Sequence, residues 1–475
     1  MKYSVLALLA TALRSVSAVT ERTYSNLEPS TSDIAKAAAT ASTTQWTSDV
    51  KGKAFDRFVV IWLENTNFDQ AAEEPHMAWL AEQGITLTNY WALTHPSEPN
   101  YMASVGGDYF SLDDDRFVYL PKNVSTVVDL LDDKGISWAT YQEHLPYTGF
   151  QGYNYSNQET FANDYMRKHN PLIFYDSVTS NDTRLSLVKN FTMFEKDLAD
   201  EKLPQYVIIT PNMTNDAHDS NIKVAGNWAK NFLTPLLENE YFMDNTLVLL
   251  TFDENETYGD QNTVFSLLLG GAIPDELKGT TDNTFYDHYS QIASAEVNWD
   301  LYNLGRNDVT ANIWQSVANA TDIENAVVDT SNLLNNHTYI GYFYDDQIEL
   351  PAPNVDATNI AGKGVLPAIS SAWASEYKEQ VSAGYFTSTT TVVSHEGTFT
   401  NLASVFEAAT ASNGGSSTAS SIASSTITTK VTSSASASAS KSSSVASPSS
   451  SKAMANGIAP AAGMSVVALV AALFM

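Results

Sequence analysis

A short segment of the chain, residues 94–101, gathers three side chains whose types could serve catalysis, one of them a candidate nucleophile. It contains the imidazole of His95, the hydroxyl of Ser97 and the carboxamide of Asn100. Its prolines fix the backbone φ angle and favour extended geometry before them, so the segment is stiff. An apolar run at 85–93 leads into it, and a strand followed by a rigid polar loop often carries reactive groups in α/β enzymes. An ordinary turn rich in Ser, Asn and Pro has the same composition.

Charged and carboxamide residues follow four apolar segments that the sequence predicts to be strands. These segments are 58–63, 206–210, 246–252 and 264–269. In an open α/β sheet the carboxyl ends of the strands meet at one crevice, so we expect these side chains to lie together. They are Glu64, Asn65, Asn67 and Asp69; Asn212, Asn215, Asp216, His218 and Asp219; Asp253, Glu254 and Asn255; and Asp287 and His288.

The set is rich in oxygen ligands and has a few imidazoles, which suits a hard or borderline divalent cation. Desolvated carboxylates would repel one another unless a cation lay among them. Such a cation could bind the hydroxyl of Ser97 and make it a stronger nucleophile. His218 and His288 could then hold a transferring anion or protonate a leaving oxygen. Helix capping or loop solvation explains each cluster taken alone, but their recurrence at successive strand ends favours a site.

Predicted strands alternate with predicted helices between residues 58 and 304. This order indicates an α/β fold with a mostly parallel sheet and helices on both faces. Beyond about residue 343 the pattern fades, and residues 346–405 are either an appended strand-rich piece or an extension of the main domain. The helices are predicted at 76–83, 125–134, 227–237 and 289–304, and a further strand at 138–141.

Charge and composition exclude several classes of partner and chemistry. The net charge of −29 and pI near 4.4 argue against binding to nucleic acid or to an anionic membrane, and they are compatible with an acidic medium. The absence of cysteine rules out disulfides, Cys-zinc sites and a thiol nucleophile. A hydrophobic content of 43% is sufficient for a large core without such cross-links.

The two ends of the chain have the composition of targeting segments. Residues 1–18 read as a signal peptide, with small residues before a cleavage point after Ala18. Residues 409–455 are rich in Ser, Ala and Thr and read as an extended, O-glycosylated stalk. Residues 456–475 resemble a GPI-attachment signal, and a disordered tail with an incidental apolar end is the alternative. Asn456 is the expected attachment residue, before Ser451 and Ala453.

Sequons for N-glycosylation occur along the whole chain, as expected of a glycosylated surface protein. Asn212 and Asn255 adjoin the strand-end clusters, which argues against modification of both. We expect glycans at Asn123, Asn154, Asn181, Asn190, Asn319 and Asn336.

Five separated motifs, in order, resemble the phosphoesterase family. That family joins bacterial phospholipase C and acid phosphatases to secreted fungal acid phosphatases on an alkaline-phosphatase-like α/β fold. The resemblance spans about residues 55–320 and is closer to the fungal enzymes, through the segment at 95–101 and the stretch at 167–171. The motifs are Trp62-Leu63-Glu64-Asn65 with Phe68-Asp69, Ser97-Glu98-Pro99-Asn100-Tyr101, Asn215-Asp216-Ala217-His218-Asp219, Asp253-Glu254-Asn255 and Asp287-His288-Tyr289-Ser290.

The resemblance implies roles for individual residues. Ser97 would be the nucleophile and form a phosphoserine, while His218 and Asn100 would contact and position the phosphoryl oxygens. His288 follows the family pattern as a further catalytic candidate. A divalent metal ion would lie among Glu64, Asn65, Asp253, Glu254 and the Ser97 oxygen.

Three other histidines have weaker assignments. The bacterial members carry a further histidine between the Glu-Asn and nucleophile motifs, and His95 is the candidate to replace it. His169 is a candidate substrate contact, although for both His169 and His144 a packed, hydrogen-bonded histidine is the favoured interpretation.

These features predict a secreted, GPI-anchored acid phosphatase that hydrolyses small phosphate monoesters at the cell surface and scavenges phosphate. Residues 19–54 would be an N-terminal extension, 55–345 the catalytic domain and 346–408 its C-terminal extension. A phosphodiesterase or phospholipase C of the same fold is one alternative, and it would prefer a phosphocholine lipid to a nitrophenyl phosphate. A non-catalytic GPI-anchored wall adhesin is the other, suggested by the Ser/Thr stalk.

Overall fold

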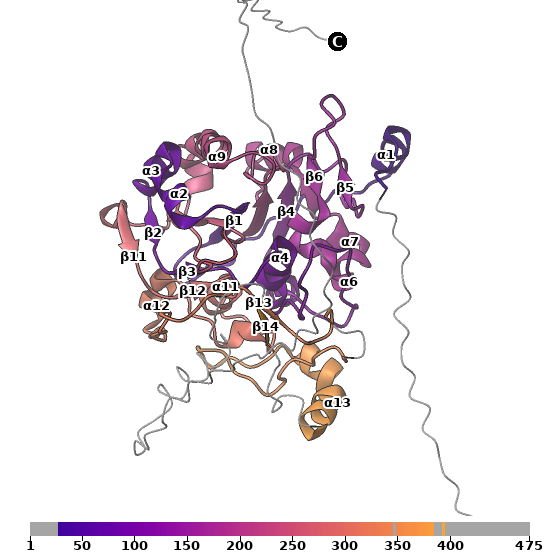
Figure 1. The fold of residues 1–475 in the computed structure, drawn as a ribbon, viewed down its shortest axis with the longest axis vertical. Coiled ribbons are helices and arrows are strands. Elements are labelled where there is room, and N and C mark those ends of the chain that lie inside the picture. The colour runs from indigo at the N-terminus through magenta and orange to yellow at the C-terminus, as the bar shows by residue number, and fades with distance from the viewer. Residues whose placement is uncertain (1–26, 345–347, 384–391, 395–475) are drawn as a thin grey trace, which may run out of the picture. The chain divides into compact units, whose positions relative to one another are not determined.

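An eight-stranded sheet forms the centre of the computed structural model, which describes residues 27–344, 348–383 and 392–394 (Figure 1). The five strands β9, β1, β8, β4 and β7 are parallel to one another, whereas β10 is antiparallel to both of its neighbours, β9 and β2. The predicted α/β class with a mostly parallel sheet is therefore confirmed. In sheet order the strands are β11 (Thr280–Asp282), β2 (Ile85–Leu87), β10 (Ser266–Leu269), β9 (Thr246–Phe252), β1 (Arg57–Leu63), β8 (Tyr206–Thr210), β4 (Trp138–Gln142) and β7 (Val188–Asn190).

The central strands are continuous apolar runs because helices cover both faces of the sheet. Every residue of β8 and β9 is buried, and so are residues 58–63 of β1. The register pairs Leu63 of β1 with Phe252 of β9, so Glu64 and Asp253 leave the sheet side by side. The pairing of Ile61 with Ile209 brings the end of β8 to the same edge.

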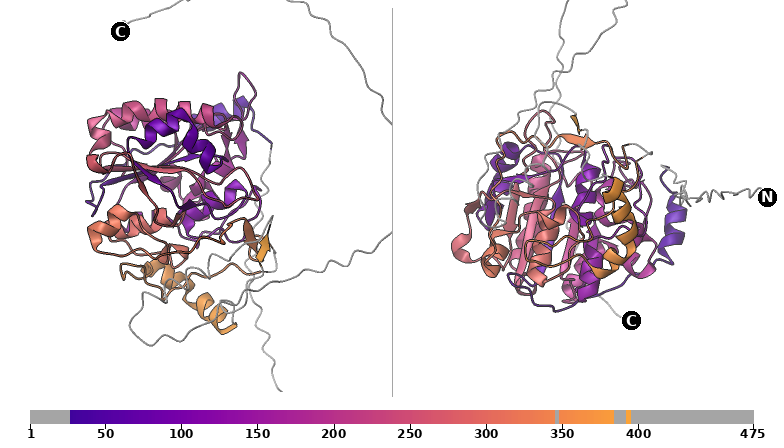
Figure 2. Two further views of the ribbon diagram at one scale, coloured as in Figure 1. Left: turned by 60° about the vertical axis from the view of Figure 1, so that its left-hand side comes forward. Right: turned by 90° about the horizontal axis from the view of Figure 1, so that it is seen from below.

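Helices pack on the two faces of this sheet (Figure 2). α5 begins with a capping box between Thr126 and Asp129 and ends at Gly135, whose φ of 74° is the left-handed conformation that glycine tolerates. One face carries α2 (Phe68–Glu73), α3 (Pro75–Ala81), α8 (Phe191–Ala199) and α9 (Ile222–Leu237), and the other carries α4 (Ser97–Gly106), α5 (Val127–Lys134) and α11 (Ser290–Trp299).

Several element boundaries differ from the prediction for local reasons. α9 begins at Ile222 instead of residue 227, because the Asn221 side chain accepts a hydrogen bond from the Lys223 N–H and caps the helix. α11 ends at Trp299, because Asp300 adopts a left-handed φ of 53°. The expected loop at 94–101 turns into α4 at Ser97, and its prolines fit because the first helical turn needs no internal N–H donors.

The N-terminal extension runs along the main domain and is hydrogen-bonded to it. After α1 (Thr31–Ala38), the Thr44 N–H donates to the carbonyl of Ser186 at 3.1 Å. Further along, the Gln205 side chain donates to the carbonyl of Val50 at 2.8 Å.

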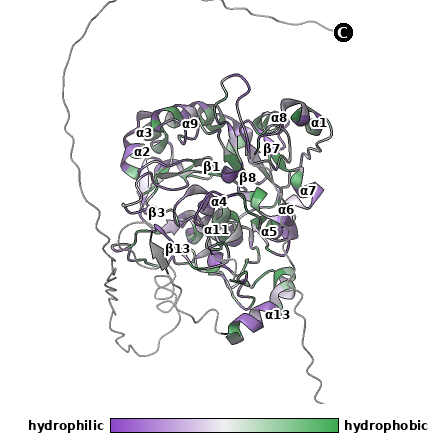
Figure 3. Ribbon diagram, turned by 45° about the vertical axis from the view of Figure 1, so that its right-hand side comes forward, coloured by the Kyte–Doolittle hydropathy of each residue, from purple (hydrophilic) through white to green (hydrophobic). Residues whose placement is uncertain are grey.

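The described part of the C-terminal extension also packs on the main domain. It contains α13 (Pro367–Ala383), so the strand-rich alternative is wrong for residues 348–383. α13 carries both hydrophobic and hydrophilic residues (Figure 3), and its buried Trp373 donates from Nε1 to the carbonyl of Asn123 at 2.8 Å. The Asn354 N–H donates to the carbonyl of Gly305 at 2.8 Å.

Shorter elements complete the described structure. β5 (Asn154–Tyr155) and β6 (Tyr165–Met166) form a hairpin whose tip, residues 158–163, is exposed.

Within the described residues, no helix combines the length and the apolar character needed to cross a lipid bilayer. The predicted signal peptide, stalk and GPI signal, including Asn456, lie outside the described residues. The other elements are β3 (Tyr90–Trp91), β12 (Tyr286–Asp287), β13 (His337–Tyr339), β14 (Val392–Ser394), α6 (Asp176–Thr179), α7 (Asp182–Leu185), α10 (Glu240–Met243), α12 (Gln315–Thr321), η1 (Arg167–His169), η2 (Pro171–Phe174), η3 (Asp275–Leu277) and η4 (Asn307–Val309).

Candidate active site

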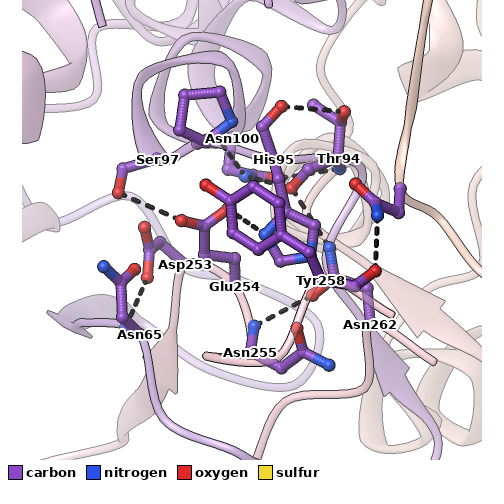
Figure 4. A network of polar contacts seen from close by, with 12 residues as sticks. Asn65, Thr94, His95, Ser97, Asn100, Asp253, Glu254, Asn255, Tyr258 and Asn262 are labelled. Carbon is purple, nitrogen blue, oxygen red and sulfur yellow. Dashed lines mark hydrogen bonds and ion pairs between the residues drawn. The ribbon is translucent and has the colours of Figure 1, made fainter. Parts of the chain in front are cut away.

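Ser97 is the first residue of α4 and lies buried at the carboxyl edge of the sheet. Its Oγ is 3.1 Å from Oε2 of Glu64 and 3.4 Å from Oε1 of Glu254 (Figure 4 shows the Glu254 contact). The Asn65 N–H donates to Oδ1 of Asp253 at 3.1 Å. Four of the residues that the strand-end patterns predicted to meet therefore lie together around Ser97: Glu64, Asn65, Asp253 and Glu254.

Four carboxylates crowd this pocket: Glu64, Asp216, Asp253 and Glu254 are all buried. Burial raises the pKa of Glu64 well above its usual range, and the charges of Asp253 and Asp216 raise it further. Burial also raises the pKa of Asp216, Asp253 and Glu254. Such a cluster is electrostatically unfavourable as it stands, because each negative charge is desolvated and faces another.

His169 lies deep in the same pocket, between two of these carboxylates. Its Nε2 is 3.3 Å from Oε1 of Glu64, and its Nδ1 is 3.4 Å from Oδ2 of Asp216. Burial lowers the pKa of His169 well below its usual range, so the ring is neutral and keeps a nitrogen lone pair. Tyr101 stacks on this ring at a centroid distance of 5.2 Å, and its hydroxyl donates to Oε1 of Glu64.

The donor set fits a divalent cation. Ligand atoms of Glu64, His169 and Asp216 lie within 4.8 Å of one another, which is close enough to share one ion. Among the described residues, Oδ2 of Asp253 and Oδ1 of Asn65 are buried with no hydrogen-bond partner. Unsatisfied buried oxygens beside mutually repelling carboxylates are what a bound cation would stabilise.

The structure thus changes the predicted ligand set in two respects. Glu64 remains central, and Asn65, Ser97, Asp253 and Glu254 surround it as predicted. Asp216, which the sequence interpretation left without a role, joins the group that could hold a metal. His169, predicted to contact substrate, joins the same group.

His95 lies at the Glu254 side of the pocket. Its Nδ1 is 2.6 Å from Oε2 of Glu254, and its ring stacks on Tyr258 with centroids 4.0 Å apart (Figure 4). His95 therefore orients Glu254, and the catalytic role assigned to it stays a prediction.

His218 is less deeply buried, with its side chain 24% exposed. Its Nδ1 is 2.8 Å from Oδ1 of Asp219, and its Nε2 is 3.0 Å from the ammonium nitrogen of Lys168. The His218 N–H donates to Oδ1 of Asp216, which ties this histidine to the carboxylate cluster. His218 is thus a partly exposed residue beside the carboxylate cluster, and its predicted contact with substrate stays a prediction.

Asn100 and His288 make structural contacts beside the cluster, and the catalytic roles assigned to them stay predictions. The Asn100 carboxamide accepts from the N–H groups of Leu93 and Thr94 and donates to the carbonyls of Thr94 and Pro96, so both of its donors are used within the loop. His288 is buried, and burial lowers its pKa to about 4. Its Nε2 contacts the backbone carbonyl of Asp253 at 2.6 Å, and its Nδ1 lies 3.1 Å from the Tyr90 hydroxyl. His288 therefore fixes the position of the Asp253 backbone through this contact.

The sequence model of the Phosphoesterase family matches residues 71–302. A probable acid phosphatase of Kluyveromyces lactis is 62% identical over 418 residues, which cover 86% of this chain and 97% of that protein. The chain belongs to the phosphoesterase family. An acid phosphatase of Aspergillus fumigatus is 60% identical over 341 residues, or 72% of this chain and 75% of that protein. A solved protein of the alkaline phosphatase superfamily from Vibrio parahaemolyticus aligns with 56% of this chain and 73% of its own, at 10% identity and a TM-score of 0.34.

Several pocket residues of this phosphoesterase had no assigned role in the sequence interpretation. Asp216, Lys168 and Tyr101 stand inside motifs that were recognised, so their position in those motifs was an available signal. Asp115 and Tyr258 follow no strand-end pattern and come near the pocket only through the tertiary fold. His144 is outside the pocket and its side chain is 49% exposed, so the packed interpretation is wrong, although the ring does pair with Asp164 at 2.9 Å.

The sequon asparagines of this phosphoesterase differ in their exposure to solvent. Asn336 is fully buried and its Nδ2 donates to the carbonyl of Tyr258, so the predicted glycan there is wrong because the folded chain leaves it no room. Asn212 and Asn255 are buried as well, in agreement with the expectation that they are unmodified. Asn123, Asn181 and Asn319 are exposed, and Asn154 and Asn190 are partly buried.

Proposed function

We propose that this chain is an acid phosphatase that hydrolyses small phosphate monoesters through a phosphoserine at Ser97. One observation carries the proposal: a buried serine hydroxyl lies 3.1 Å from Glu64 and 3.4 Å from Glu254, at the edge of a cluster of four buried carboxylates. The relatives named acid phosphatase, which are 50% to 62% identical, support the same activity.

The geometry suggests how the chain's own residues would act. Glu64 orients the hydroxyl of Ser97 and accepts its proton as Oγ attacks phosphorus. The bond from phosphorus to the ester oxygen breaks, and the departing alcohol takes up a proton at the exposed edge of the pocket, where His218 lies. Water then attacks phosphorus and gives up a proton at the same exposed edge, the bond from phosphorus to Oγ breaks, Oγ regains its proton from Glu64, and inorganic phosphate leaves with Ser97 restored.

A divalent cation would be held by Glu64, His169 and Asp216, with Asp253 and Asn65 beside it. When bound, it would supply positive charge that favours the ionised serine and the negative charge of the transferring phosphoryl group. Tyr101 would fix the Glu64 carboxylate through its hydroxyl, and His288 would fix the backbone of Asp253.

The proposed setting is the cell surface, where the enzyme would release phosphate from external esters. The signal-peptide pattern at 1–18 and the GPI-signal pattern at 456–475 support it. Release of active enzyme from intact cells by a phosphatidylinositol-specific phospholipase C tests the anchor. Activity that stays on the cells after complete treatment would contradict it.

The test of activity is a pH-rate profile with p-nitrophenyl phosphate on the wild type and Ser97→Ala, before and after chelation. We expect an acidic optimum in the wild type, loss after chelation, and loss of turnover by roughly four or more orders of magnitude in the variant. Ser104→Ala is the matched control, since Ser104 lies in the same helix and its hydroxyl donates only to the Tyr101 carbonyl. Faster hydrolysis of a phosphocholine lipid than of the monoester would favour the phospholipase C alternative instead.

A further inference from the structure

Lys168 places a buried ammonium group at the edge of the carboxylate pocket. It belongs to η1, next to His169, and its side chain is only 8% exposed. Its Nζ is 2.8 Å from Oδ2 of Asp115 and 3.0 Å from Nε2 of His218. An ammonium group has three N–H donors, so one donor remains beyond these two contacts.

The charge of Lys168 reaches the residues around the nucleophile. Burial raises the pKa of Glu64, Asp216 and Glu254, and the positive charge of Lys168 opposes that rise at all three. The neighbouring Arg167 has a different environment, because its guanidinium lies over the rings of Phe117, Tyr119 and Phe174. Lys168 is therefore the member of this basic pair that faces the pocket.

Asp115 neutralises Lys168 without belonging to the carboxylate cluster. Its side chain is 27% exposed, so water can solvate its carboxylate if the ion pair opens. Its other oxygen, Oδ1, accepts from the Glu98 N–H at 3.0 Å, which holds it beside the nucleophile segment. An incoming phosphate ester carries up to two negative charges and competes with Asp115 for the same ammonium group.

We propose that Lys168 binds the phosphoryl oxygens of the substrate and that Asp115 is the resting counter-ion which the phosphate displaces. This inference rests on the proposed phosphatase function and adds a specificity element to it. Above about pH 6, where a phosphate monoester is a dianion, it gains more from a single ammonium charge than a diester monoanion does. Lys168 therefore favours monoesters over diesters, and Asp115 limits the affinity for both substrate and inorganic phosphate.

The two residues give variants with opposite expected effects. Lys168→Met removes the charge at similar length, and we expect the KM for p-nitrophenyl phosphate and the Ki for inorganic phosphate to rise roughly 10- to 100-fold. Lys168→Arg keeps a positive charge and should recover part of the loss. Asp115→Asn keeps the Oδ1 acceptor for the Glu98 N–H but frees the ammonium group, so both constants should fall roughly 2- to 10-fold.

Asp114→Asn is the matched control, because Asp114 is the neighbouring acid and pairs with Arg116 instead, at 2.8 Å. It makes the same charge change in the same loop, so a fall in Ki as large as that of Asp115→Asn would overturn the inference. An unchanged or raised Ki in Asp115→Asn would overturn it as well. The ratio of kcat/KM for p-nitrophenyl phosphate to that for bis-p-nitrophenyl phosphate should fall in Lys168→Met, and an unchanged ratio would contradict the monoester preference.

Calorimetric titration of each variant with inorganic phosphate keeps this inference separate from the proposed function. If the wild type hydrolyses no phosphate ester, the proposed function fails. If the wild type is active but Asp115→Asn binds phosphate no more tightly, only the role of Lys168 and Asp115 fails. Should Lys168→Met not fold, the sign of the Asp115→Asn effect still decides.

Discussion

Asp287 provides a quantitative test of how buried carboxyl groups set the pH dependence of stability. It ends β12, and its Oδ1 accepts from the N–H groups of Tyr289 at 2.9 Å and Ser290 at 3.3 Å, where α11 begins. Among the described residues its Oδ2 is buried without a hydrogen-bond partner. Burial raises the pKa of Asp287 from 3.8 to about 7. That difference of about 3 corresponds to about 4 kcal/mol of unfolding free energy.

The sign of this effect follows from proton binding. Between about pH 4 and pH 7 the folded chain keeps a proton on Asp287, whereas the unfolded chain has released it. The folded state therefore binds more protons, and its stability falls by about 1.4 kcal/mol per pH unit through this one group as the pH rises. Asp287→Asn keeps the Oδ1 acceptor and removes the titration, so the variant should lose that part of the slope.

The assay is urea unfolding of the wild type and Asp287→Asn at several pH values from about 4.5 to 7.5. The difference between the two unfolding free energies should change by about 3 to 4 kcal/mol across that range, in favour of the variant at the higher pH. Glu276→Gln replaces an exposed acid and is the control. The difference between its unfolding free energy and that of the wild type should stay constant over the same pH range. Parallel curves for Asp287→Asn would refute the reasoning, because the carboxyl would then titrate alike in both states.

Three further predictions follow from the pocket and the surface. Asn100→Leu removes four hydrogen bonds to backbone groups and should lower the unfolding free energy by about 2 to 4 kcal/mol, and an unchanged denaturation midpoint would contradict the supporting role. Asp216→Asn should reduce the metal bound per chain, measured by inductively coupled plasma mass spectrometry, at least tenfold; wild-type metal content would exclude Asp216 as a ligand. Peptide mapping should find glycans at the exposed Asn123 and Asn181 and none at the buried Asn336, and a glycan there would contradict the described packing.

The meeting of the strand-end residues could be predicted because it depends on local patterns. Apolar runs mark β1, β8 and β9 in the sequence, and parallel strands deliver the residues after them to one edge. Glu64 and Asp253 are adjacent for that reason, since the register places Leu63 opposite Phe252.

Side-chain direction and long-range neighbours could not be predicted in the same way. Asn100 stands in the nucleophile motif, but its carboxamide points into its own loop, which spacing along the chain does not reveal. His169 comes from η1, outside the sheet, and reaches Glu64 only because that segment folds over the sheet edge. The burial of Asn336 depends on contact with the Tyr258 loop, far away in sequence. These contacts depend on tertiary packing, and they produce no periodic pattern in the sequence.

The exposed β5–β6 hairpin tip divides the chain between two groups of pocket residues. A cut at this tip would leave each fragment with only part of the carboxylate pocket, although the sheet could still bring the fragments together. Catalysis would then report reassembly, so the chain could serve as a split enzyme that signals when two fused partners associate. The first fragment would carry Glu64 and Ser97, and the second would carry His169, Asp216 and Asp253.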